Sequence, residues 1–220
     1  MFSGVAVCFD TTFTRFCREG DLSGDLRRIV SLSEIFAHGF GILICVSLIW
    51  SITPRLRKFI PRFLCIAILP GLAVHLFKLT IVRRRPSFFK RNFADYVNDT
   101  WIGVDFGNAE YLTQSFPSAH TATAFGLALG LSWLIPRGRV VFFAFAILAS
   151  FQRIMAGAHW LSDVLAGVGV AFVVAGLLFQ NFGLGQLLYY FENRAGENAS
   201  RSDSVELPAS IATRSIQKAA

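Results

Sequence analysis

The chain has 220 residues, of which 54% are hydrophobic and only 16% are charged, and its mean hydropathy is +0.52. Soluble proteins carry about 25% charged residues, so this composition excludes an ordinary water-soluble domain, a disordered chain, a collagen-like fibre and a disulfide scaffold. The net charge of +7 invites a nucleic-acid interpretation, which the placement of the charges has to decide.

The first segment, residues 1–34, differs from the rest because charged side chains interrupt each of its apolar runs. It lacks the basic start and the long apolar stretch of a secretory signal peptide. Apolar residues recur in it at roughly helical spacing, which predicts an amphipathic helix at the membrane interface. They are Phe9, Phe13, Phe16 and Cys17.

Four long stretches of the remaining chain contain no Asp, Glu, Lys or Arg. They are residues 35–54, 63–77, 111–136 and 164–191. About 20 helical residues cross the apolar layer of a bilayer, which is about 30 Å thick. The sequence therefore predicts an all-α, polytopic transmembrane helical bundle of five to six spans, with a soluble helical core as the less favoured alternative. Helices are expected near residues 35–52, 63–82, 119–135, 140–156 and 160–182.

These helices predict one membrane domain over residues 35–192. Residues 193–220 are rich in Ser, Ala and Arg, and they predict a disordered cytoplasmic tail. The segment over residues 87–116 is aromatic, and we expect it either to admit a lipid tail at the membrane interface or to pack on the bundle.

Several residues of chemically active types are expected to be structural. The four cysteines lack the spacing of a metal site and predict free thiols, although the first two would be able to pair in an oxidising compartment. These cysteines are Cys8, Cys17, Cys45 and Cys65. His38 and His75 have no partners in the sequence, and Gly126 and Gly130 have the spacing of close helix packing.

Three polar clusters stand at the ends of predicted spans, where ionisable groups are costly and usually functional. The first contains Lys78 and Arg85, followed by Pro86. Lys78 and Arg85 are two helical turns apart, so both side chains are expected along one helix face at the membrane surface. A basic anchor that extends to the lipid headgroups is the competing interpretation.

The second cluster is the run Pro117, Ser118, Ala119 and His120, directly before an apolar stretch. Ser118 is well placed as the N-cap of a helix, with His120 in the first turn. A helix N-terminus presents free backbone N–H groups and a partial positive charge, so this cluster predicts an anion site.

The third cluster contains Arg153, His159 and Asp163. On one helix, His159 and Asp163 would be neighbours, and the carboxylate would accept a hydrogen bond from one imidazole nitrogen. That contact leaves the other nitrogen as a nucleophile. Arg153 offers a planar guanidinium suited to phosphate oxygens. A polar turn with an ion pair inside the helix is the competing interpretation.

Taken together, the three clusters resemble the motifs of the type 2 phosphatidic acid phosphatase superfamily, which includes membrane lipid phosphatases, vanadium haloperoxidases and bacterial acid phosphatases. The resemblance covers about residues 35 to 182 and carries the patterns Lys-x6-Arg-Pro, Pro-Ser-x-His and Arg-x5-His-x3-Asp. Two positions depart from the family pattern, because Ala119 replaces a glycine and Gln152 replaces a serine.

The resemblance implies a mechanism in which His159 attacks phosphorus to form a phosphohistidine and Asp163 orients His159. His120 would protonate the leaving oxygen and then activate water. Five residues would hold the phosphoryl oxygens. They are Lys78, Arg85, Ser118, Ala119 through its amide, and Arg153. The implied chemistry needs no metal and no cofactor.

The basic residues also predict the orientation of the chain. Residues 53–62 carry four basic side chains and residues 136–139 carry two, without an acidic residue in either turn. By the positive-inside rule both turns face the cytoplasm, so the three motifs meet on the outer face. The sequence thus predicts a multi-pass protein of a bacterial inner membrane with its site on the periplasmic side.

The leading functional hypothesis is a membrane phosphatase acting on a lipid phosphate or diphosphate at the outer leaflet. A phosphotransferase that uses the same phosphohistidine and a non-catalytic protein that binds or transports lipid phosphates are the alternatives. Phosphatidate, phosphatidylglycerol phosphate, undecaprenyl diphosphate and lipid A share the phosphoryl group that these motifs read, so the lipid itself stays open, as does the oligomeric state. The nucleic-acid interpretation is dropped, because the basic residues form turns and a pocket rather than a soluble basic surface.

Overall fold

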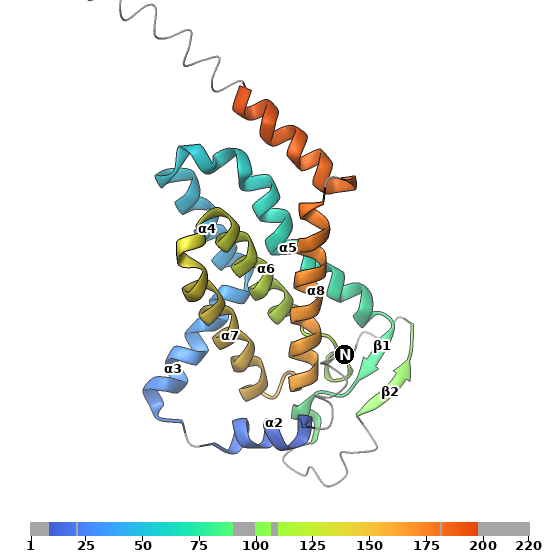
Figure 1. The fold of residues 1–220 in the computed structure, drawn as a ribbon. Helices are drawn as coiled ribbons and strands as arrows, with labels where there is room; N and C mark the ends of the chain where they lie inside the picture. The colour runs from blue at the N-terminus through green and yellow to red at the C-terminus, as the bar shows by residue number, and fades with distance from the viewer. Residues whose placement is uncertain (1–8, 21, 90–99, 107–109, 181, 198–220) are drawn as a thin grey trace, which may run out of the picture.

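The computed structural model describes residues 9–20, 22–89, 100–106, 110–180 and 182–197. Its longer helices pack side by side into a bundle, with two shorter N-terminal helices at one end and a short sheet beside them (Figure 1). The helices are α2 (Asp10–Glu19), α3 (Gly24–Leu32), α4 (Gly39–Ile52), α5 (Ile60–Lys78), α6 (Ala119–Leu134), α7 (Arg139–Met155) and α8 (Leu161–Phe179). Five short 3-10 segments are η1 (Ser33–Ala37), η2 (Pro54–Phe59), η3 (Pro86–Phe89), η4 (Tyr111–Thr113) and η5 (Pro136–Gly138).

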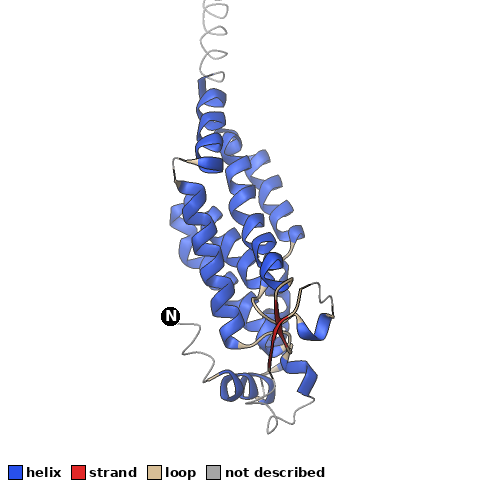
Figure 2. Ribbon diagram, turned by 90° about the vertical axis from the view of Figure 1, so that its right-hand side faces the viewer, coloured by secondary structure: helices blue, strands red, loops and turns tan. Residues whose placement is uncertain are grey.

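The five helices expected from the apolar stretches are present as α4 to α8, but the second ends earlier than expected. α5 stops at Lys78, and residues that we assigned to its last turn form strand β1 (Ile81–Arg83). The run Thr80, Ile81 and Val82 is β-branched and favours a strand. β1 pairs antiparallel with β2 (Trp101–Val104), at the same end of the bundle as α2 (Figure 2).

The expected count of five to six spans is not confirmed. Among the described helices, three are long and apolar enough to cross a membrane alone, over residues 54–78, 136–155 and 161–179. A fourth candidate joins Gly24–Ala37 to Gly39–Ile52 across a bend of 71°. α6 has only 16 residues and lies inside the bundle, where it contacts α5, α7 and α8.

The N-terminal helix α2 lies across the end of the bundle and contacts α7 and α8 (Figure 1). The expected apolar face does not turn inward as a unit, because Cys17 is buried while Phe9 and Phe16 are exposed. The other buried side chains of α2 are those of Asp10 and Thr14. α2 therefore presents both these polar groups and the apolar side chains of Phe13 and Cys17 to the bundle.

At the opposite end, helical structure continues over residues 183–197, beyond the point where the tail was expected to begin (Figure 2). This helix is held by a buried ion pair in which Arg62 Nε lies 2.7 Å from Glu192 Oε1. Residues 198–220 of the predicted tail lie outside the described residues, as does Cys8. The thiols of Cys17, Cys45 and Cys65 are free.

Close packing of α5 against α6 confirms the interpretation of the paired glycines. A Cβ atom on Gly126 would lie 2.5 Å from the carbonyl oxygen of Ile66. A Cβ atom on Gly130 would lie 2.9 Å from the ring of Phe63. The two helix backbones therefore approach as closely as they do only because both positions lack a side chain.

We expect Gly126→Ala to lower the stability of the protein by about 1–3 kcal/mol, because the new methyl group meets a backbone oxygen that cannot move alone. Gly169→Ala is the matched control, since a Cβ atom at Gly169 in α8 meets nothing within 4 Å. Alanine in an open helical position should leave stability equal or higher. Thermal unfolding in detergent measures both variants, and an equal effect of the two would contradict this packing.

Candidate active site

The three predicted clusters meet at one end of the bundle, where α5 and α7 end and α6 and α8 begin (Figure 1). Hydrogen bonds join the second cluster, and Ser115 just before it, to the third. Ser118 N donates to the backbone oxygen of Asp163 at 3.0 Å, and His159 Nδ1 lies 2.7 Å from the backbone oxygen of Ser115. The basic turns over residues 53–62 and 136–139 lie at the other end of the same helices.

His159 is held by the turn between α7 and α8. Gly157 in this turn has a φ of +67°, a conformation that favours glycine, and the N–H groups of Ala158 and His159 both donate to Arg153 O. Because a carbonyl only accepts, the contact with Ser115 O places the proton of His159 on Nδ1. Among the described residues, Nε2 has no hydrogen-bond partner. Burial lowers the pKa of His159 to about 4, so the imidazole is neutral near pH 7.

His159 and Asp163 approach each other as expected, but at a distance longer than a direct hydrogen bond. His159 lies before the first residue of α8, and its Nδ1 is 3.7 Å from Asp163 Oδ2. That oxygen instead accepts the hydroxyl of Ser115 at 2.6 Å and the backbone N–H of Trp160 at 2.9 Å. Asp163 therefore holds Ser115 and the backbone of Trp160, which both lie beside His159. Ser115 O orients the imidazole ring of His159.

Arg83, which the sequence analysis missed, joins two buried carboxylates. Its Nη1 donates to Asp163 Oδ1 and, at 2.7 Å, to Ser162 Oγ, while its Nη2 donates to Asp10 Oδ2 at 2.7 Å. Asp10 also accepts from the backbone N–H and the hydroxyl of Ser162. The side chains of Arg83, Asp10 and Asp163 are at most 1% exposed. The sequence signal for Arg83 was its place in a run of three arginines, the last of which, Arg85, belongs to the first cluster.

Lys78 and Arg85 reach the site by different routes, not along one helix face as expected. Lys78 is the buried last residue of α5, whereas Arg85 follows strand β1. Arg85 Nε donates to Tyr111 O at 2.8 Å, and its guanidinium lies 3.8 Å from the centre of the Tyr111 ring. Lys78 interacts electrostatically with Arg85, Arg153 and Asp163, so the cations of two motifs share one site.

Ser118 is the N-cap of α6, as the sequence predicted. Its buried hydroxyl accepts the N–H of Thr121 at 3.4 Å and the hydroxyl of Thr121 at 3.0 Å. Ala119 is the first residue of α6, and His120 lies in its first turn. The His120 ring contacts His38 edge-on, with 4.9 Å between ring centres. No described residue forms a hydrogen bond with the His120 imidazole.

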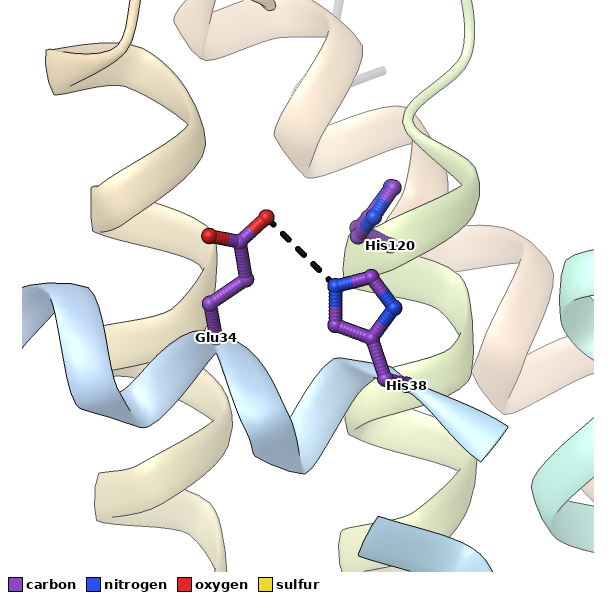
Figure 3. A group of neighbouring side chains, drawn as sticks. All are labelled: Glu34, His38 and His120. Atoms are coloured by element: carbon purple, nitrogen blue, oxygen red, sulfur yellow. Dashed lines mark hydrogen bonds and ion pairs between the residues drawn. The ribbon is translucent and has the colours of Figure 1, made fainter. Parts of the chain in front are cut away.

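Arg153 is bound by a carboxylate that the sequence analysis did not consider. Its Nη1 donates to Glu34 Oε1, and Gln152 Nε2 donates to Glu34 Oε2 at 3.0 Å. Glu34 Oε1 also lies 3.5 Å from His38 Nε2, and Figure 3 shows these side chains beside His120. His38, which was expected to be structural and has no partner in the sequence, lies against the predicted site residue His120. The one available signal was that Glu34 directly precedes the predicted span over residues 35–52 and His38 lies near the start of that span.

An apolar cavity of about 580 Å³ opens beside His120, between α4, α5 and α6. His38, His75, Ala119 and Thr123 lie in its wall together with His120, and most of the other lining residues are hydrophobic. They include Ile42, Leu43, Val46, Leu64, Ile68 and Leu72. Leu43 and Leu72 are more than half exposed, so the cavity borders the outer surface of the bundle.

A model of the PAP2 superfamily matches residues 59–184, which is more than half of the chain. The chain belongs to the PAP2 superfamily. Each of the predicted site residues lies inside the matched segment, whereas Asp10, Glu34 and His38 lie before it.

The PAP2 chain is also similar to curated proteins and solved structures. It is 35% identical over 120 residues to a lipid A 1-phosphatase of Rhizobium etli and equally to one of Rhizobium johnstonii. These matches cover 50% of this chain and 49% and 46% of the relatives, so the chain spans about half their length.

Two crystal structures share the fold. LpxE of Aquifex aeolicus has a TM-score of 0.54 at 19% identity, covering 77% of this chain and 93% of that one. A transmembrane PAP2 type phosphatidylglycerolphosphate phosphatase of Bacillus subtilis has a TM-score of 0.52 at 16% identity, covering 80% of this chain and 90% of that one.

The charges of this PAP2 site suit an anion. Glu34, His38 and His120 offer possible metal-ligand atoms within 4.8 Å of one another, a cluster found among the described residues. Glu34 is, however, already bound to Arg153, and His120 interacts electrostatically with both Arg153 and Lys78. A divalent cation would be repelled by these two cations, whereas a phosphoryl group would be attracted.

We expect Arg83→Gln to destabilise the protein by about 3–5 kcal/mol, because it leaves the buried carboxylates of Asp10 and Asp163 without their cation. Arg15→Gln is the matched control, since Arg15 forms an exposed ion pair with Glu19 in α2. Such a pair contributes at most about 1 kcal/mol. Thermal unfolding in detergent compares the two variants, and similar midpoints would show that Arg83 does not hold this end of the bundle together.

Proposed function

We propose that this PAP2 protein is a membrane lipid phosphatase that works through a phosphohistidine on His159. The observation that carries the proposal is the orientation of His159, whose Nδ1–H donates a hydrogen bond to Ser115 O. Its other nitrogen, Nε2, is therefore a neutral nucleophile, and Lys78 and Arg85 are its cationic neighbours. A neutral imidazole beside fixed cations is suited to attack on an anionic phosphorus centre.

The reaction proceeds in two displacements. His159 Nε2 forms a bond to phosphorus while the bond from phosphorus to the lipid oxygen breaks. His120, which has to be protonated in the complex with the anionic substrate, donates its proton to that oxygen. His120 then accepts a proton from water, and the water oxygen displaces His159 to release phosphate. Lys78, Arg85 and Arg153, with the amide of Ala119 and the hydroxyl of Ser118, hold the phosphoryl oxygens in both steps. Asp163 orients the nucleophile through Ser115.

A lipid fits the surroundings of the site. The apolar cavity of about 580 Å³ begins at His120 and borders the outer surface of the bundle. An acyl chain in this cavity would leave the headgroup beside His120. We propose lipid A carrying a 1-phosphate as the first substrate to test, because the relatives at 35% identity are named lipid A 1-phosphatase.

We also propose that the site lies on the periplasmic side of a bacterial inner membrane. The six basic residues of the turns over residues 53–62 and 136–139 lie at the end of the bundle opposite the site. Basic turns are retained in the cytoplasm during insertion. The bacterial relatives are consistent with this location.

We expect the purified protein to release inorganic phosphate from at least one member of a lipid panel, with activity retained in excess EDTA. The panel contains lipid A 1-phosphate, phosphatidylglycerol phosphate, phosphatidate and undecaprenyl diphosphate. Retention follows because fixed cations of the chain replace a metal at the phosphoryl oxygens. Loss of activity in EDTA would overturn the mechanism, and binding of these lipids without release would support a non-catalytic protein.

We expect His159→Ala to abolish turnover and to form no phosphoenzyme, because the attacking nitrogen is lost. His120→Asn should slow turnover by about 10²–10⁴-fold and accumulate an acid-labile phosphoenzyme when a diphosphate substrate with a good leaving group is used. Arg15→Ala is the control, since Arg15 forms an exposed ion pair on α2 and does not line the cavity. Acid-quench labelling with ³²P detects the intermediate. Robust phosphate release by His159→Ala would contradict the assignment of the nucleophile.

A further inference from the structure

Two side chains from outside the family-matched segment reach the proposed phosphoryl site. Glu34 lies in η1 and His38 directly follows it, and η1 packs against both α6 and α7 (Figure 3). Glu34 touches Arg153 at the end of α7, and His38 touches His120 in the first turn of α6. A single short segment therefore contacts one proposed phosphate ligand and the proposed general acid.

The carboxylate of Glu34 is placed where it competes with a phosphoryl group. Carboxylate and phosphate oxygens both accept hydrogen bonds from the in-plane N–H groups of an arginine guanidinium, so they compete for the same donors. Glu34 Oε1 accepts a hydrogen bond from Arg153 Nη1, and the side-chain amide of Gln152 donates to Glu34 Oε2 at 3.0 Å. Arg153 Nη1 also donates to Gln152 Oε1 at 3.2 Å, so a phosphoryl oxygen that binds this nitrogen has to displace one of these two acceptors, of which Glu34 is the charged one.

The charges around Arg153 explain why a carboxylate is held there. Arg85 and Lys78 both interact electrostatically with Arg153, and so does His120. The other described acidic residue that interacts with Lys78 and Arg85 is Asp163. Its two carboxylate oxygens are bound to Arg83, Ser115 and Trp160. Glu34 is thus the described acidic group that directly offsets the positive charge of Arg153.

His38 is held between the carboxylate and the proposed general acid. Its Nε2 lies 3.5 Å from Glu34 Oε1, and its ring meets the His120 ring at an interplanar angle of 85°. Edge-to-face contact between rings contributes about 0.5–1.5 kcal/mol and fixes their relative orientation. His120 has no hydrogen-bond partner among the described residues, so this contact contributes to holding its ring.

We propose that Glu34 and His38 are positioning residues of the phosphoryl site. Glu34 holds Arg153 in the resting enzyme and gives up this place to a phosphoryl oxygen of the substrate. His38 holds the ring of His120 beside the leaving oxygen. The second role rests on the proposed function, whereas the competition at Arg153 concerns phosphate binding alone.

Binding of inorganic phosphate tests the competition without any turnover. In a titration followed by thermal shift in detergent with EDTA present, Glu34→Gln should bind phosphate about five-fold more tightly than the wild type, since an ion pair of about this strength no longer competes. Glu19→Gln, which removes an exposed carboxylate of α2, should leave phosphate binding unchanged. Unchanged or weaker phosphate binding by folded Glu34→Gln would overturn the proposal.

Gln152→Leu gives a second route to the same answer if Glu34→Gln does not fold. It removes the amide that donates to Glu34 Oε2 and also the Oε1 acceptor that lies 3.2 Å from Arg153 Nη1, while Arg153 and the carboxylate remain. Phosphate binding should again become tighter, by a smaller factor. Weaker or unchanged binding by this variant would count against the competition.

Steady-state kinetics with the lipid substrate tests His38. His38→Gln should lower kcat by about 2- to 10-fold with little change in KM, because the ring contact that orients His120 is lost. Arg15→Gln, in the exposed ion pair of α2 with Glu19, should change neither value. Equal behaviour of the two variants would overturn the role of His38. If the wild type releases no phosphate from any lipid, the proposed function fails, while the phosphate titration still decides the role of Glu34.

Discussion

The buried guanidinium of Arg83 is the contact on which this end of the molecule depends. It binds Asp163 at the start of α8 and Asp10 at the start of α2, and both carboxylates are almost fully removed from water. Each charge would be costly to bury alone, so the three groups are stable only together. The N-terminal helix, the strand β1 and the turn that carries His159 are therefore assembled as one unit.

The pairing of the acidic side chains also determines which positive charges of the proposed site remain for phosphate. Asp163 is committed to Arg83, Ser115 and Trp160, so it orients His159 through the backbone of Ser115 without drawing a proton from it. The cations of Lys78, Arg85 and Arg153 remain for the phosphoryl group, and Glu34 provides the described carboxylate on Arg153. The apolar cavity beside His120 then separates the lipid tail from these charges.

Features that depend on local sequence were predicted well. The apolar stretches located α4 to α8, Ser118 was recognised as the N-cap of α6, and the spacing of Gly126 and Gly130 indicated the close approach of α5. The predictions failed where the chain leaves a helix. α5 ends at Lys78 because a β-branched run follows, and His159 precedes α8, so neither Lys78 with Arg85 nor His159 with Asp163 shares a helix face.

By itself, the sequence determined the helical membrane bundle and the residue types of the phosphate chemistry, because hydrophobicity and motif spacing are properties of contiguous residues. Tertiary structure alone decided the partners: Ser115 O for His159, Asp10 for Arg83, and Glu34 with His38 for Arg153 and His120. Those contacts join residues 44 to 119 positions apart. They form because buried ions and imidazoles must find counter-charges and acceptors wherever the packed helices bring them, and no local pattern records which ones these are.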